Sequence, residues 1–318
     1  MNRSPFRLFV GTIFALGLSL GLASSVQALS LAPSILEVQA NPGETKTVVV
    51  SLLNDESEPV RIESTIQKFI PLGTGGQQQF LSPEDTSGLP SWTFVGGVAG
   101  GLRPGEKQNV TIQIRVPSEA PMGGAYEAVF FSARPLAEAV AGTVGLRSKI
   151  GALILLTVGD ATQTELAISD WRLLEAGTQS SLSGTVQLTL KNVGRTHTTP
   201  KGELVVRNMF GGVVSRVPMN PLNARILPAS ERTFVVLFGE ETSSSGWGKL
   251  KNELAAFGIG RYEITLEGVD GLPQIEPLRM VVLPWRVIGS GALLLLLLAV
   301  MFRLYRSYLI KALQTQRP

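Results

Sequence analysis

Residues 110–116 read Val-Thr-Ile-Gln-Ile-Arg-Val, and this stretch decides the fold class. Apolar side chains occupy every second position, whereas a helix would repeat them every three to four residues. A strand that alternates in this way buries one face and leaves the other in water. The stretch therefore predicts a half-buried β-strand.

The same alternation returns at 186–191 and at 262–267. Turn-forming clusters separate such stretches, for example Asn-Pro-Gly at 41–43, Pro-Gly at 104–105 and Asn-Val-Gly at 192–194. Few helical patterns lie between them. We therefore expect an all-β fold of antiparallel sandwiches rather than a parallel sheet.

Two short motifs recur and predict two domains with the same strand order. Asn54 and Asn192 each end a predicted strand, and the words Gly-Ala-Tyr-Glu at 124–127 and Gly-Arg-Tyr-Glu at 260–263 each open a later one. The spacing from Asn54 to Gly124 is 70 residues and that from Asn192 to Gly260 is 68. We place the domains at 29–160 and 161–284.

Turns of the same kind support this repeat. Pro-Gly-Glu at 42–44 and at 104–106 precedes predicted strands, and proline followed by glycine suits the two central positions of a type II turn. Pro-Ala-Ser-Glu at 228–231 occupies the equivalent place in the second domain.

Two apolar segments flank the predicted domains. Residues 1–28 have a basic start, a short apolar run and small residues before position 29, which is typical of a signal peptide cleaved after Ala28. An uncleaved anchor is the alternative. Residues 285–303 predict a transmembrane helix with six consecutive leucines and Trp285 at one boundary; a buried core helix is the alternative.

The charge distribution gives an orientation and excludes a nucleic-acid partner. The formal charge is +3, but six of the 28 basic residues lie before residue 8 or after residue 302, and all 25 acidic residues lie between these positions. The part between is therefore net negative and offers no basic patch for nucleic acid. The tail 304–318 is basic without acids, which predicts that it is cytoplasmic and the domains are outside. The absence of cysteine favours a bacterial envelope protein.

The strand ending at Asn54, the Pro-Gly-Glu turn and Pro-Met-Gly-Gly-Ala-Tyr at 121–126 together resemble bacterial immunoglobulin-like domains, particularly the WxL-interacting protein family. That resemblance implies two tandem Ig-like β-sandwich domains, a peptidoglycan-binding first domain, a second domain that contacts partners, and a C-terminal membrane helix. Periplasmic pilus chaperones share the apolar first strand and the second strand that ends in asparagine.

Residues suited to catalysis or metal binding are scarce. His197 is the only histidine and follows a predicted strand, so we expect a turn residue rather than a zinc ligand or a catalytic base. The acidic pairs at 84–85 and 240–241 are better explained as solvated loop residues than as glycosidase carboxylates. No phosphate-binding glycine loop is present. We expect no enzyme activity, no metal and no cofactor.

Aromatic and apolar residues in two predicted surface segments are the candidate partner-binding residues. The glycine- and glutamine-rich stretch 72–101 is expected to be a long loop that carries Trp92 and Phe94, and Trp92 suits stacking on a sugar ring. Burial in the sandwich core is the plainer explanation of Trp92. A helical insertion near 246–257 places four further residues on one apolar face, namely Trp247, Leu250, Leu254 and Phe257. A lid packed on its own sandwich is the alternative.

Together these observations predict a non-catalytic, membrane-anchored envelope protein. Its outer domains would bind cell-wall glycan, a surface protein or both. The alternative is a membrane-tethered periplasmic assembly chaperone of the pilus-chaperone type, which pairs a strand edge with an exported subunit. That alternative predicts an exposed and apolar edge strand.

Overall fold

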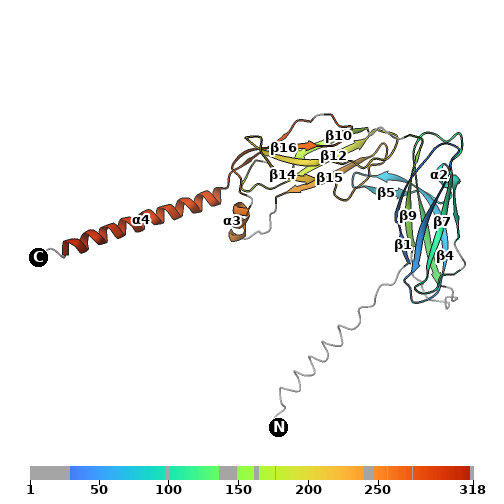
Figure 1. Cartoon of the computed structure of the whole chain (residues 1–318), viewed down its shortest axis with the longest axis horizontal. Coiled ribbons are helices and arrows are strands. Elements are labelled where there is room, and N and C mark those ends of the chain that lie inside the picture. Colours follow the sequence, from blue (N-terminus) through green and yellow to red (C-terminus); the bar gives the residue numbers. More distant parts are fainter. Residues whose placement is uncertain are drawn as a thin grey trace, which may run out of the picture.

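A computed structural model describes residues 29–97, 101–135, 149–160, 165–175, 177–239, 246–255, 257–273 and 275–315. Two β-sandwiches follow one another along the chain, and a long helix projects from the second (Figure 1). The all-β prediction is confirmed, whereas the predicted signal peptide at 1–28 lies outside the described residues.

Nine strands and one short helix build the first domain. One sheet has the order β1-β3-β7-β6 and the other has the order β2-β9-β8-β4-β5. All neighbouring strands are antiparallel except β2 and β9, which run parallel. The elements are β1 (Leu29–Ala32), β2 (Ile35–Ala40), β3 (Thr45–Asn54), β4 (Val60–Leu72), β5 (Gln77–Phe80), α2 (Leu89–Trp92), β6 (Thr93–Gly96), β7 (Lys107–Arg115), β8 (Gly123–Pro135) and β9 (Lys149–Val158).

The second domain repeats this plan with one strand fewer. Its sheets have the orders β10-β12-β15 and β11-β17-β16-β13-β14, and β11 runs parallel to β17 as β2 does to β9. The described residues contain no counterpart of β6. The strands are β10 (Leu166–Leu173), β11 (Thr178–Gln179), β12 (Gly184–Asn192), β13 (Glu203–Asn208), β14 (Val213–Pro218), β15 (Glu231–Phe238), β16 (Gly260–Glu267) and β17 (Leu278–Val282).

The same buried asparagine closes a corner in each domain. The Asn54 side-chain amide donates to the carbonyls of Glu58 and Leu102, at 3.0 and 2.9 Å. The Asn192 amide donates to the carbonyls of Thr196 and Ile226, at 2.8 and 2.9 Å. A buried amide that meets backbone carbonyls in this way satisfies groups that water cannot reach. The repeat predicted from these two residues is therefore present in three dimensions.

Each corner also receives a turn with a positive φ. Gly105 has φ 71° and its N–H donates to the Asn54 carbonyl at 2.8 Å. Ala229 has φ 54° and its N–H donates to the Asn192 carbonyl at 3.0 Å. The predicted glycine at the third turn position is confirmed at Gly105, where φ is positive. The second domain accepts alanine at the same conformation.

Strand pairing corrects the predicted alignment of the two domains by one residue. Gly123 pairs with Val158 at the end of β9, and Gly260 pairs with Val282 at the end of β17. Gly260 therefore corresponds to Gly123 and not to Gly124. Because a shift of one residue reverses the face of every side chain, Glu127 corresponds to Ile264 rather than to Glu263.

The segment 72–101 is not the long loop that the sequence predicts. It contains β5, α2 and β6, each four residues long. Elements this short show too few repeats of a hydrophobic pattern to be recognised. β6 pairs with β7 from Thr93 opposite Ile114 to Gly96 opposite Thr111.

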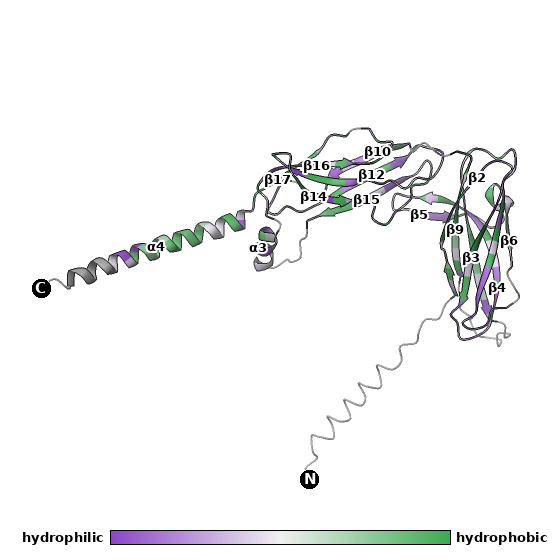
Figure 2. Cartoon of the chain, in the orientation of Figure 1, coloured by the Kyte–Doolittle hydropathy of each residue, from purple (hydrophilic) through white to green (hydrophobic). Residues whose placement is uncertain are grey.

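Two helices follow in the second half of the chain. α3 (Gly246–Ala255) lies between β15 and β16, and α4 (Trp285–Thr315) follows β17. Within α4, Trp285–Tyr308 is 24 residues long and apolar enough to cross a membrane, and none of it is buried. Figure 2 shows this apolar stretch as a largely green segment. The helix continues into the basic tail because no helix-breaking residue interrupts it.

Candidate functional site

The two domains meet through an apolar contact. Leu227 of the second domain packs with Phe69, Ala128 and Leu155 on the outer face of the five-stranded sheet of the first domain. The Gly124 N–H donates to the Arg195 carbonyl at 2.8 Å. A side chain at Gly123 would meet that carbonyl at 3.0 Å, and φ there is 134°, so the glycine permits the close approach.

His197 lies in this junction. It follows the turn after β12 as predicted, and its ring forms an edge contact with Tyr126, with centroids 5.8 Å apart. Its Nδ1 is 3.4 Å from the Tyr126 hydroxyl. Burial lowers the pKa of His197, and the nearby carboxylate of Glu37 opposes this effect. The ring is therefore a neutral packing element at neutral pH.

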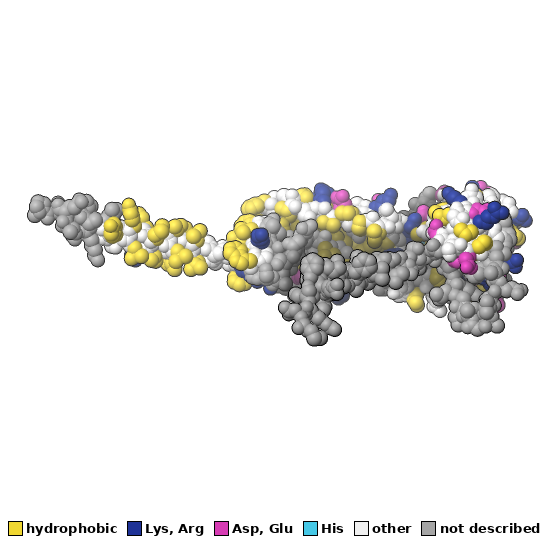
Figure 3. Space-filling model, turned by 90° about the horizontal axis from the view of Figure 1, so that it is seen from below, with side chains coloured by type: hydrophobic (Ala, Val, Ile, Leu, Met, Phe, Trp, Pro, Cys, Tyr) yellow, Lys and Arg dark blue, Asp and Glu magenta, His cyan; other side chains and the backbone are white. Residues whose placement is uncertain are grey.

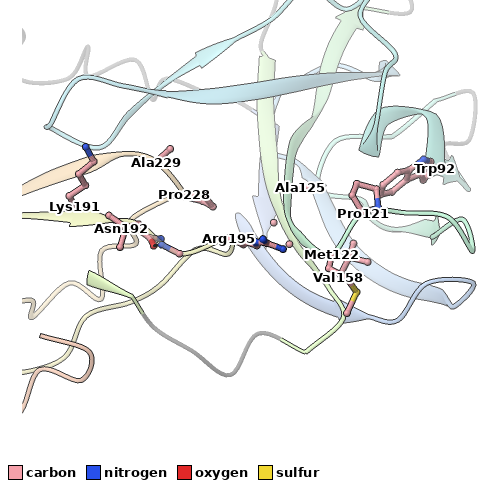
Figure 4. Close-up of a pocket in the computed structure, with 14 residues that line it drawn as sticks. Trp92, Pro121, Met122, Ala125, Val158, Lys191, Asn192, Arg195, Pro228 and Ala229 are labelled. Carbon is pink, nitrogen blue, oxygen red and sulfur yellow. Dashed lines mark hydrogen bonds between the residues drawn. The ribbon is translucent and has the colours of Figure 1, made fainter. Parts of the chain in front are cut away.

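A cavity of 560 Å³ opens beside the junction, between both domains. Trp92 and Pro121 lie on its first-domain side, Pro228 and Lys191 lie on its second-domain side, and Arg195 lies between them (Figure 4). None of the salt bridges between described residues involves Arg195. The cavity thus combines an aromatic wall with a guanidinium group that could bind an anionic group.

Within the described residues, no strand pairs with the outer edge of β15. The sheet ends at this strand, and within the described part of the chain only β12 pairs with it. Phe234, Val236 and Phe238 are buried, whereas Val235 and Leu237 are 55% and 65% exposed. All five residues of this run are apolar. The exposed apolar edge strand that the chaperone alternative predicts is therefore present.

The backbone of this edge is also available to a partner. The N–H of Thr233 points away from β12 and donates to the carbonyl of Thr74, in the turn between β4 and β5, at 2.9 Å. Because the direction of these groups alternates along a strand, the N–H and C=O groups of Val235 and Leu237 point the same way. The first domain thus covers the start of the β15 edge and leaves its second half open.

Two other edges of the second domain, those of β10 and β14, carry features that discourage pairing. β10 has a register shift between Ile168 and Asp170 and carries Arg172. β14 carries Arg216 and ends at Pro218. Charges, bulges and prolines of this kind protect sheet edges against added strands. The second half of β15 has none of them.

Trp92 and Phe94 do not form one surface. Trp92 is half-buried against the core of the first domain and also lines the cavity at the junction. Phe94 lies on β6, half-exposed, under the Arg115 guanidinium at 4.7 Å from the ring centroid. Packing against the core of the first domain therefore explains most of the burial of the Trp92 side chain.

The predicted apolar face of α3 is exposed for the most part. Trp247 is 78% exposed, Leu254 and Phe257 are also exposed, and Leu250 is half-buried. A lid closed over its own sandwich would bury these side chains. Within the described residues they contact no such core.

Glu127 is a buried acid that sequence reasoning missed. It is fully buried in β8, and neither carboxylate oxygen has a hydrogen-bond partner. Thr93 lies near, but its hydroxyl donates to the Leu89 carbonyl at 3.1 Å. Burial raises the pKa of Glu127 to about 7. The alternation of β8 places residue 127 on the core face, but assigning that face required the register of the strand.

No group of three or more potential metal-ligating side chains occurs in the part of the chain that the structure describes. Comparisons with protein-family models and with curated proteins found no match.

Several solved structures share parts of the fold. The class 5 fimbriae chaperone CfaA has a TM-score of 0.38 and 14% identity, over 80% of this chain and 99% of that chain. The E. coli chaperone DraB gives 0.37 and 13%, over 81% and 97%. The Salmonella enterica SafA pilin complex with the SafB chaperone gives 0.36 and 14%, over 82% and 99%. At these values the likeness does not transfer a function.

These comparisons correct the resemblance expected from the sequence. The matching structures named above are fimbrial chaperones and not WxL-interacting proteins, and no family model matches the chain. The resemblance to the WxL-interacting family is therefore wrong. That resemblance rested on short sequence motifs at turns and strand starts, which many β-sandwiches with similar turns can share. Peptidoglycan binding, which that resemblance implied, has no support.

Proposed function

We propose that this chain is a membrane-tethered, extracytoplasmic binding protein that pairs the edge of β15 with an extended segment of an exported polypeptide. In this respect it would act as an assembly chaperone; the fimbrial proteins compared above are named chaperones. The observation that carries the proposal is the exposed, uncharged and unprotected second half of the β15 edge.

Helix α4 supports the tether. It follows β17 after two residues, its apolar stretch is long enough for a bilayer, and its C-terminal side carries the basic tail. This arrangement would hold both sandwiches on the opposite side from the tail. A bound polypeptide would then be retained at the membrane surface.

Strand addition explains why an apolar edge is useful. A segment added beside β15 would satisfy the outward backbone groups of Val235 and Leu237 and cover their side chains. The cavity at the domain junction lies toward the other end of β15, where Arg195 would bind an acidic group of the same partner. We expect no catalytic step.

Site-specific photo-crosslinking in cells that produce the full chain tests this proposal. A photoreactive residue at position 235 should form adducts with an exported polypeptide, and the linked residues of that polypeptide should be alternate residues of one extended segment. The same probe at Arg172, an exposed position on the protected edge strand β10, is the matched control.

A second substitution connects the adducts to the edge itself. Leu237→Lys places a charge on the bare edge and should lower the adduct yield at position 235 by about tenfold. Leu222→Lys changes an exposed leucine away from the edge and should leave the yield unchanged. Equal yields at 235 and 172, or no effect of Leu237→Lys, would contradict the proposal.

A further inference from the structure

Exposed apolar side chains gather at the end of the second domain from which α4 leaves. Figure 3 shows hydrophobic side chains where the helix meets the sandwich. Phe210 is 86% exposed, and the other side chains named below are all more than half exposed. We call this set the apolar end; its members are Met209, Phe210, Trp247, Leu254, Phe257 and Trp285.

Strand pairing places these separate segments together. Met209 and Phe210 form the tip of the β13–β14 hairpin, and Asn208 at its base pairs with Tyr262. Gly260 pairs with Val282, three residues before α4. A side chain at Gly260 would meet the Met209 methyl at 2.7 Å. The hairpin tip, the start of β16 and the start of α4 therefore share one end.

A buried carboxylate fixes α3 to the same end. Glu253 is 1% exposed and accepts hydrogen bonds from the N–H groups of Arg286 and Val287, at 3.1 and 3.2 Å. It also forms a salt bridge with the Arg286 guanidinium at 2.7 Å. An acid in this position caps the first turn of α4. In Figure 1, α3 is drawn across the direction of α4.

Exposure of the apolar end to water would not explain why these side chains gather there. Soluble surfaces seldom gather large apolar side chains in one place, and aromatic rings are favoured at the headgroup level of a bilayer. If α4 spans a membrane from Trp285, a helix held at its first turn by Glu253 would lie at the level of the membrane surface. Its Lys249 and Lys251 are exposed, as expected for an interfacial helix.

We propose that the apolar end rests in the headgroup region of the lipid bilayer, with the 209–210 hairpin tip and the side chains of Trp247, Leu254 and Phe257 inserted beside α4. This inference rests on the membrane tether of the proposed function. The continuity of the surface with α4 is what favours lipid over a protein. Because the sequence also has Glu240 and Glu241 before α3, insertion of apolar groups rather than attraction to anionic lipid drives the contact.

Single cysteines test the contact, since the chain has none of its own. The full chain is reconstituted in phosphatidylcholine vesicles with an environment-sensitive fluorophore at Phe210→Cys or Phe257→Cys. Leu222→Cys is the matched control, because Leu222 is 89% exposed and follows the opposite end of β14. Leu295→Cys, within the apolar stretch of α4, reports whether the chain is inserted at all.

Lipids with a nitroxide on the headgroup should reduce the fluorescence at positions 210 and 257 by about half and leave position 222 nearly unchanged. Lipids with a nitroxide within the acyl chain should quench position 295, which lies near the middle of the apolar stretch. Acyl-chain quenching at 295 without headgroup quenching at 210 and 257 overturns the inference and leaves the tether intact. Absence of acyl-chain quenching at 295 overturns the tether and the inference together. Protection of 210 and 257 from a water-soluble quencher in native membranes, without lipid quenching in vesicles, overturns it in favour of a protein partner.

Discussion

The two sandwiches follow one strand plan, and they differ at the sheet edge next to β7 in the first domain and β15 in the second. In the first domain β7 lies between β3 and β6, so its outer edge is covered. In the second domain β15 occupies the position of β7, and the described residues contain no strand beside it on that side. The four residues of β6 therefore cover part of the β7 edge, whereas no strand among the described residues lies beside the corresponding edge of β15.

A second difference lies in the cores. Glu127 in the first domain occupies the position of Ile264 in the second, and both are fully buried. One sandwich therefore retains an acid where its counterpart holds a branched apolar residue. The shared strand plan therefore does not depend on an apolar residue at this position.

Moving the buried acid between the two cores, or removing it, should have the largest effect. Ile264→Glu should lower the free energy of unfolding of the second domain by about 4–5 kcal/mol at pH 8, because a charge is buried and apolar burial is lost. Glu127→Leu should raise that of the first domain by about 3 kcal/mol at pH 8, which is the equivalent of a pKa raised from 4.5 to about 7. Hydrogen exchange during urea unfolding resolves the two domains.

The pH dependence identifies the charge as the cause. The pKa of Glu127 is higher in the folded than in the unfolded state, so the folded state binds the proton more tightly. The contribution of Glu127 to stability is therefore most favourable below pH 4.5 and is lost as the pH rises through 7. The gain from Glu127→Leu should shrink at pH 4. An equal gain at both pH values would show that charge is not involved.

Removing the shared corner should affect both domains alike. Asn54→Ala and Asn192→Ala each leave one buried and one partly buried carbonyl without their amide donor, and each should cost about 2–3 kcal/mol. Exchange of the amides in β3 and in β12 measures the two effects separately. Asn109→Ala, at an exposed asparagine, is the control and should cost less than about 0.5 kcal/mol. A clear inequality between the two corners would break the equivalence of the domains.

Exchanging the turn residues should have the smallest effect, with opposite signs in the two domains. Ala229→Gly relieves a positive φ and should stabilise the second domain by about 0.5–1 kcal/mol, whereas Gly105→Ala should destabilise the first by about 1 kcal/mol. A methyl group at position 105 would have no atom within 4 Å, so backbone conformation alone sets the cost. Thermal unfolding of both variants measures it, and equal signs would refute this explanation.

Local sequence signals predicted the repeated architecture, since alternation at 110–116 and the asparagines at 54 and 192 report strands and corners directly. They could not predict β6, because four residues are too few to show a hydrophobic period. They could not predict the uncovered edge of β15 either, because an edge depends on which strand is absent beside it. The same limit explains the alignment error at Gly124: similar words do not fix register. The exposed residues of α3 were identified from their helical spacing, but their place beside α4 depends on Glu253.

The capped start of α4 limits how far the two domains could move relative to the membrane. Only Leu283 and Pro284 separate β17 from the helix, and Glu253 binds the first N–H groups of its opening turn. A flexible tether lets a domain search a volume whose size grows with linker length. This joint has no such linker, so any membrane-bound copy would hold its strand edge at one height and one angle above the bilayer. Partners would then be selected by their position relative to the bilayer as much as by their sequence.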